Sequence, residues 1–301
     1  MWSQRYSRTD SPLFVFIGSR LMRILPVFWL ANVLSAIVAA AVDPTFLSPS
    51  APHWGALPAT ASNLLLLGYA RLPHSQGALH VAWSLDVEMQ FYLVFPLALY
   101  LCTRPRSGAF WTYVVVAGCC AGFVLFMAPS ETVSPNLGFD ALYFLIGAVS
   151  AHRDWRPKES WAAASLALTA GIVVVCWALP GLRHLFENGR HGATLADFHE
   201  KRVAQALLTL ISAPVALVSV RNPSGSFDRA LGELTYVIYL VHWPIMTLHQ
   251  HYFLHLRPIE RLPSLLGAWL VVAVVSFGVY RYFDQPIEAV RKRWVAARTV
   301  V

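Results

Sequence analysis

Residues 264–283 read SLLGAWLVVAVVSFGVYRYF, a continuous apolar run whose one charged side chain, Arg281, lies near its end. A helix needs about 20 such residues to cross the roughly 30 Å hydrocarbon core of a bilayer. Further runs, of which 137–151 is the weakest, lie near residues 24–42, 82–102, 109–127, 137–151, 161–180, 203–220 and 231–249. The sequence therefore predicts an all-α fold, a polytopic transmembrane helical bundle of about eight spans.

The scarcity of charged side chains supports this prediction. Of the 301 residues, 56% are hydrophobic and 13% are charged, whereas soluble globular proteins carry roughly 25% charged residues. No polar stretch is long enough to form a soluble domain, so residues 1–301 are expected to form a single membrane domain. Because the cysteines lie in apolar runs without metal-ligand spacing, no disulfide or metal site is predicted for Cys102, Cys119, Cys120 and Cys176.

The basic residues follow the ends of the apolar runs. A net charge of +7 would suit a nucleic-acid-binding protein if these residues formed one patch. With eight spans, 16 of the 23 Lys and Arg residues fall on the side of the termini and 7 on the other side. Because basic residues are enriched in cytoplasmic loops, both termini are predicted to be cytoplasmic. The protein is thus expected in the cytoplasmic (inner) membrane, in contact with the lipid bilayer and without a nucleic-acid partner.

Two loops on the outer side, 43–81 and 181–202, are long enough to do more than connect helices. The first contains a short apolar stretch from Asn63 to Tyr69, which cannot span a bilayer and fits a re-entrant or interfacial segment. This loop is expected to cover an outward-facing cavity.

Residues 82–96, AWSLDVEMQFYLVFP, place Asp86, Glu88 and Gln90 at the start of a predicted span. An ionised carboxylate at the bilayer centre costs roughly 2.5–3.5 kcal/mol on insertion scales, so such residues usually face a protein interior and mark functional sites. Ser84 and Glu88 share a helix face, and Asp86 lies about 200° from Glu88, so Glu88 is expected to face inward. In the alternative, Glu88 pairs with a basic residue for packing and Ser84 caps the helix.

A second set of polar residues lies in 231–244, LGELTYVIYLVHWP, where Tyr239 and His242 share one face with His249 beyond the segment. Pro244 invites a kink. Histidine is the side chain best suited to proton transfer near neutral pH. A structural hydrogen bond to a neighbouring helix is an equal alternative for His242, and the favoured interpretation for His249.

Arg20 and Arg23 share one face at the cytoplasmic entrance of the first predicted span. Two guanidinium groups can bind a phosphate-rich ligand in a bidentate manner. The alternative is an orientation signal that also attracts anionic lipid, and the residues alone favour it. The tail 280–294, YRYFDQPIEAVRKRW, is predicted to end the last span and to form a basic cytoplasmic anchor without a catalytic role.

Four of these segments together resemble the acyltransferase 3 family. RLMRILPVFWL matches its basic pair before a proline-aromatic-Trp run, WSLDVEMQFYLVFP and LGELTYVIYLVHWP match its two most specific motifs, and FDQP matches its terminal motif. The four occur in the expected order over residues 13–290. The resemblance implies a membrane O-acyltransferase that moves an acyl group, in most members acetyl, from cytoplasmic acyl-CoA to a hydroxyl of an extracytoplasmic glycan or glycolipid.

The resemblance also implies roles for individual residues. Glu88 and His242 would be catalytic and would orient groups or shuttle protons, while Arg20 and Arg23 would bind the donor. The side chains that would shape the cavity are Trp83, Ser84, Tyr92 and Tyr239, although Trp83 also fits an interfacial belt residue. Acyl-CoA would act as a co-substrate, with no bound cofactor.

The sequence departs from the family pattern in three places. Asp86 occupies a position where the family often has a small polar residue, and Asp284 one where Glu is usual. Family members also begin with two further spans that carry a basic residue and a histidine, which have no counterpart after Met1. Either the true start of the protein lies upstream of Met1, or the chain is a shortened, non-catalytic relative or assembly subunit. A polytopic transporter is a further alternative, against which the absence of internal repeats argues.

Overall fold

The computed structural model describes residues 8–43, 57–68, 78–102, 144, 147, 150, 154–185, 195–221, 225–257 and 259–299. Within these ranges the chain is helical, no strand occurs, and one isolated β-bridge joins Thr9 to Thr299. The all-α prediction is confirmed for this part of the chain. The predicted span near 109–127 and most of the span near 137–151 lie outside it.

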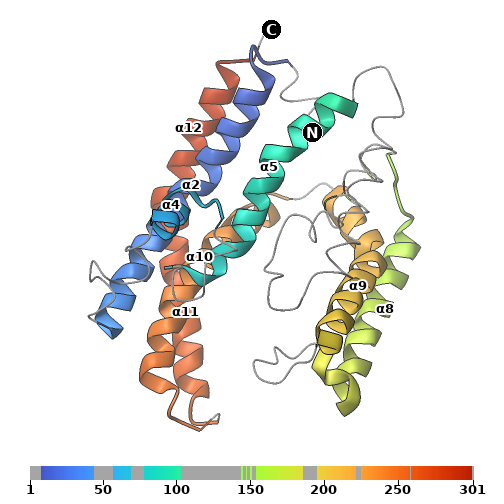
Figure 1. Cartoon of the computed structure of the whole chain (residues 1–301), viewed down its shortest axis with the longest axis vertical. Helices are drawn as coiled ribbons and strands as arrows, with labels where there is room; N and C mark the ends of the chain where they lie inside the picture. Colours follow the sequence, from blue (N-terminus) through green and yellow to red (C-terminus); the bar gives the residue numbers. More distant parts are fainter. Residues whose placement is uncertain are drawn as a thin grey trace. The chain divides into compact units, whose positions relative to one another are not determined.

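The chain divides into two compact units, one formed by residues 1–96 and 224–301 and the other by residues 97–223. The second unit contains α8 (Glu159–Ala178) and α9 (Leu195–Arg221), which pack against each other (Figure 1). The Ser165 hydroxyl of α8 donates a hydrogen bond to the carbonyl of Ile211 in α9 over 2.5 Å. All of the predicted site residues belong to the first unit.

The first unit is built from one long N-terminal helix, a short helix of the 43–81 loop (called the outer loop after its predicted side) and four later helices. Their bounds are α2 (Pro12–Val42), α4 (Leu57–Leu65), α5 (Trp83–Cys102), α10 (Ser226–Phe253), α11 (Leu262–Val279) and α12 (Gln285–Ala296). A 3₁₀ turn, His80–Ala82, precedes α5, and a π-helical segment, Tyr280–Asp284, joins α11 to α12.

Four helices of the described ranges are long and apolar enough to cross a membrane: Pro12–Val42, Glu159–Ala178, Val203–Arg221 and Leu262–Ala296. The helices α5 and α10 are not among them, although both were predicted to span. The total of eight spans and the cytoplasmic position of the termini stay predictions.

Two helix boundaries differ from the predicted ones. The first helix begins at Pro12 rather than near residue 24, so Arg20 and Arg23 lie inside it and not at its entrance. Its 31 residues extend over roughly 46 Å, longer than a hydrocarbon core. The helix stop expected at FDQP is wrong, because the π-helical segment continues the helix into α12. Pro286 stands just after the π-helical segment, and because the helix is continuous there, its missing N–H removes one backbone hydrogen bond.

The hydrophobic core of the first unit includes residues of the outer loop. Leu66 follows α4 and Leu79 precedes α5, and both are fully buried against Phe28 of α2 and Leu240 of α10. The short apolar stretch of the loop therefore enters the bundle, which its length alone could not establish. That the loop covers a cavity stays a prediction.

Three polar side chains of α2 hold this loop through its backbone. The Trp29 indole donates to the carbonyl of Leu64 over 2.7 Å, and the Asn32 amide donates to the carbonyl of Asn63 over 2.9 Å. The Ser35 hydroxyl donates to the carbonyl of Ala78 over 2.5 Å. Backbone groups buried in an apolar bundle need such partners, since water is not available there.

The ends of α2 and α12 lie side by side (Figure 1). Arg291 of α12 is 7% exposed, donates to the Ser19 hydroxyl of α2 over 2.6 Å, and pairs with Glu288 one turn earlier. Gly18 of α2 lies beneath the Trp294 ring. A small residue at position 18 thus allows the two helices to approach closely.

Replacement of Gly18 by alanine is expected to lower the thermal unfolding midpoint of the detergent-solubilised protein. The new Cβ would lie 2.7 Å from the Trp294 ring, and overpacking of this kind costs roughly 1–3 kcal/mol. Gly278→Ala in α11 is the matched control, because its Cβ would meet nothing within 4 Å and alanine favours a helix by up to about 1 kcal/mol. Equal effects of the two substitutions would contradict the close contact.

Candidate functional site

Glu88, Tyr92 and Arg20 form a line of contacts between α5 and α2. The Tyr92 hydroxyl donates a hydrogen bond to the Glu88 carboxylate one turn earlier on α5. The guanidinium carbon of Arg20 lies 4.7 Å from the centre of the Tyr92 ring and 5.3 Å from that of Phe16. Cation–π contacts of this kind strengthen where water is excluded. Tyr92 therefore contacts the Glu88 carboxylate through its hydroxyl and the Arg20 guanidinium group through the face of its ring.

Ser84 and Tyr239 connect the first turn of α5 to α10. Their hydroxyl oxygens are 2.7 Å apart, and the Tyr239 hydroxyl also lies 2.8 Å from the carbonyl of Val81, to which it donates. A carbonyl cannot donate, so Ser84 donates to Tyr239 when the Tyr239 proton serves Val81. Ser84 and Tyr239 were both predicted to shape the cavity, and the structure brings them into contact.

His242 lies one turn after Tyr239 on α10, with the two ring centres 5.9 Å apart. Its Nδ1 atom is 3.2 Å from the carbonyl of Ile238, and its ring is stacked on Trp269 of α11 with an interplanar angle of 4°. Because the carbonyl can only accept, this hydrogen bond requires the proton on Nδ1 and leaves the lone pair on Nε2. In the neutral imidazole, this hydrogen bond makes Nε2 the atom that can accept a proton.

His249 has a different environment from His242. It is buried, and its Nε2 atom lies 3.0 Å from the hydroxyl of Ser264 at the start of α11. The structural interpretation, favoured for His249 from the sequence, agrees with this contact between neighbouring helices.

Asp86 is more deeply buried than Glu88, contrary to the expectation that Glu88 faces inward and Asp86 does not. Its side chain is 0% exposed, whereas that of Glu88 is half-buried. The Asp86 carboxylate accepts hydrogen bonds of 3.0 Å from the backbone N–H of Gly68 and from the Gln90 side chain. The helical wheel correctly placed Asp86 and Glu88 on different faces of α5. The face of Asp86 is buried because the outer loop covers it.

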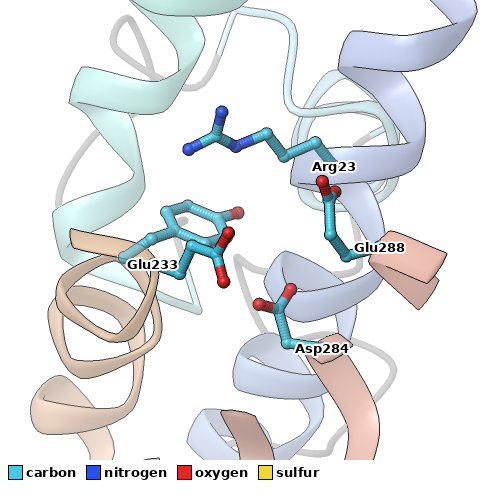
Figure 2. Close-up of a pocket in the computed structure, with 5 residues that line it drawn as sticks. Arg23, Glu233, Asp284 and Glu288 are labelled. Atoms are coloured by element: carbon cyan, nitrogen blue, oxygen red, sulfur yellow. The ribbon is translucent and has the colours of Figure 1, made fainter. Parts of the chain in front are cut away.

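Arg23 and three carboxylates line one small pocket (Figure 2). Arg23 reaches into it from α2, Glu233 from α10, and Asp284 and Glu288 from the π-helical segment and α12. Tyr236 completes the lining and donates to the carbonyl of Ile24 over 2.8 Å. The volume of about 50 Å³ accommodates a few water molecules and no cofactor.

The two arginines therefore have unlike surroundings, although they share one helix face. Arg20 is held by aromatic rings, and its Nε atom has no hydrogen-bond acceptor among the described residues. Arg23 lies in a pocket whose carboxylates offset its charge. Sequence reasoning missed Glu233, Asp284 and Glu288 as neighbours of Arg23, although Glu233 and Asp284 stand inside the LGELTY and FDQP motifs.

Two further expectations concern Trp83 and metal binding. Trp83 is 38% exposed at the start of α5, where an interfacial belt residue would also lie. In the part of the chain that the structure describes, no group of three or more His, Cys, Asp or Glu side chains could hold a metal ion.

The Ser84–Tyr239 contact is expected to appear as an energetic coupling. In a double-mutant cycle, Ser84→Ala and Tyr239→Phe should each destabilise the protein, and the double variant should lose less than the two losses added together. The coupling should be about 1 kcal/mol, the net contribution of one buried hydrogen bond. Unfolding by SDS in mixed micelles measures it, and strictly additive losses would show that the two hydroxyl groups do not interact.

Comparison with known proteins gives one positive result. No curated protein and no solved structure matches the chain significantly. A family model described as an acyltransferase domain matches residues 1–281. The matched region includes all six residues of the Arg20–Tyr92–Glu88 and Ser84–Tyr239–His242 groups. The match favours an acyltransferase over the transporter alternative. The chain is an integral membrane protein that belongs to the acyltransferase 3 family.

Proposed function

We propose that this protein transfers an acyl group, acetyl in the first instance, from cytoplasmic acyl-CoA to a hydroxyl of an extracytoplasmic glycan or glycolipid. The observation that carries the proposal is two groups of polar contacts that follow one another along one face of α5. The first joins Arg20, Tyr92 and Glu88, and the second, one turn away on α5, joins Ser84, Tyr239 and His242. Polar side chains are costly inside a bilayer, so a line of two such groups favours a reaction path.

The proposed topology gives this line a direction. With a cytoplasmic N-terminus, α2 runs outward and α5 runs inward. Arg20 is then about 12 Å from the cytoplasmic start of α2, and Ser84 lies in the first turn at the outer end of α5. The line would connect a donor side to an acceptor side.

The chemistry of acyl transfer requires one group that accepts a proton and others that orient the reactants. The acceptor oxygen attacks the thioester carbonyl and loses its proton, and the sulfur of CoA takes up a proton as the C–S bond breaks. His242 suits the first role through Nε2. Glu88, joined to Tyr92, would orient this region or pass on the proton.

Donor binding would fall to Arg20 and Arg23, which can form charge-assisted hydrogen bonds to phosphate. The carboxylates around Arg23 lower the positive potential there, so Arg20 is expected to contribute more. Trp83 would border the acceptor side of the cavity. In this proposal the protein acts in the inner membrane as a multi-pass enzyme with acyl-CoA as co-substrate, no bound cofactor and no nucleic-acid partner.

The test is acetyl transfer by purified protein in proteoliposomes, with [¹⁴C]acetyl-CoA as donor and an envelope glycan fraction of the source cells as acceptor. Label that enters the glycan and is released by mild base as acetate supports an O-acyltransferase. Labelled glycan or sugar that crosses the membrane without acetyl-CoA would instead indicate a transporter. No transfer by folded protein would contradict the proposal.

Glu88→Gln should lower acetyl transfer by at least about 100-fold, the usual range for a lost acid–base group, while thermal stability stays close to that of the parent. The amide still accepts the Tyr92 hydroxyl but cannot carry a negative charge. Asp228→Asn is the matched control, because Asp228 is an exposed carboxylate on α10. Full activity of a folded Glu88→Gln protein would remove Glu88 from the mechanism.

The double variant Arg20→Ala, Arg23→Ala should raise the KM for acetyl-CoA by about tenfold or more, since a hydrogen bond to a charged group contributes roughly 1.5–3 kcal/mol. Among the single variants, Arg20→Ala should have the larger effect. Arg229→Ala serves as a control for loss of an exposed positive charge. Unchanged acetyl-CoA binding by the double variant, measured by calorimetry, would count decisively against these two residues as donor contacts.

A further inference from the structure

Asp86 has no role in the proposed reaction, yet it is among the most deeply buried side chains of the first unit. We infer that Asp86 is a positioning residue: its carboxylate fastens the outer-loop segment Leu66–Gly68 to α5 and thereby fixes the turns of α5 that carry Ser84 and Glu88. The attachment itself follows from the contacts. Its effect on catalysis rests on the proposed function.

The Asp86 carboxylate is satisfied from two sides. The backbone N–H of Gly68 donates to it from the loop, and the Gln90 side chain donates from the next turn of α5, each over 3.0 Å. A buried carboxylate without such donors would carry a large desolvation penalty. Because a loop backbone group is one of its donors, burial of Asp86 depends on the position of the loop.

The segment Leu66–Gly68 has a backbone that only its surroundings can maintain. Gly68 has φ of +78°, which glycine adopts freely, but Leu66 has φ of +60°, a conformation that costs a residue with a side chain roughly 1–2 kcal/mol. The Leu66 side chain is 0% exposed in the core, and the Ser62 hydroxyl donates to the carbonyl of Leu67 over 2.8 Å. Asp86, Leu66 and Ser62 together hold the segment in this shape.

This attachment matters for α5 because it acts on the face away from Ser84 and Glu88. Ser84 contacts Tyr239 of α10, and Glu88 contacts Tyr92, which carries Arg20 of α2. Asp86 lies about 200° around the helix from Glu88. Contacts on two opposite faces fix the rotation of a helix about its axis, whereas contacts on one face leave it free to roll. Loss of the Asp86 contact should therefore misalign Ser84 and Glu88 without removing either.

The first measurement is hydrogen exchange by mass spectrometry on the full chain in nanodiscs. Asp86→Ala should speed exchange at the Gly68 amide at least tenfold, while Asp86→Asn should have a smaller effect because its amide oxygen still accepts. Gly68→Ala is the second variant, since it strains the loop at φ +78° and leaves Asp86 intact. Asp228→Asn is the control. Unchanged exchange at Gly68 in folded Asp86→Ala and Gly68→Ala, or equal acceleration throughout α10 and α11, would overturn the inference.

The second measurement is acetyl transfer from [¹⁴C]acetyl-CoA to the envelope glycan fraction. Asp86→Ala should lower kcat at least tenfold with the KM for acetyl-CoA unchanged, and Asp86→Asn should restore part of the loss. A purely structural role would instead lower the amount of active protein equally with both variants. Normal kcat in Asp86→Ala with a loosened loop would refute the positioning role. If the parent protein shows no transfer, the proposed function fails, while the exchange data still decide whether Asp86 holds the loop.

Discussion

A polar group buried in the first unit is costly unless it finds a partner inside the protein, because neither lipid nor an apolar core supplies hydrogen bonds. This constraint explains why α5 and α10 are arranged as they are. Their hydroxyl, carboxylate and imidazole groups contact one another or a backbone carbonyl, as in the Ser84–Tyr239 and Tyr92–Glu88 pairs. These hydrogen bonds stabilise the fold, and they also place the polar groups next to one another, as a reaction site requires.

The outer loop supplies hydrogen-bond partners to α2 and side chains to the hydrophobic core. Trp29, Asn32 and Ser35 of α2 bind its backbone, and Leu66 and Leu79 fill the core between the helices. Without the loop, α2 would expose three polar side chains within a span and the core would contain a void. The loop segment therefore behaves as a structural element of the bundle, despite being too short to span it.

The sequence was sufficient to predict the helical fold, the membrane setting and the family, since all three depend on long apolar runs and on motifs read along one helix. The family resemblance also assigned Ser84 and Tyr239 to one site, and their hydroxyl groups are in contact; that they line a cavity stays a prediction. The sequence could not predict that Asp86 is buried, because that depends on a loop folding back over one face of α5. The pocket around Arg23 was missed for a related reason. Glu233, Asp284 and Glu288 are brought together because α10, the π-helical segment and α12 all pack against α2, and because a helix continues where a stop was expected.

The π-helical segment Tyr280–Asp284 has a consequence for how one continuous helix serves two environments. A π turn holds about one residue more than an α turn, so the faces before and after it are offset by about 100°. The apolar face of α11 and the face of α12 with Arg291 and Trp294 thus need not lie along one line. The extra residue rotates every later position of the helix about its axis. The sequences of α11 and α12 can therefore change independently of each other only while the length of the segment Tyr280–Asp284 is preserved.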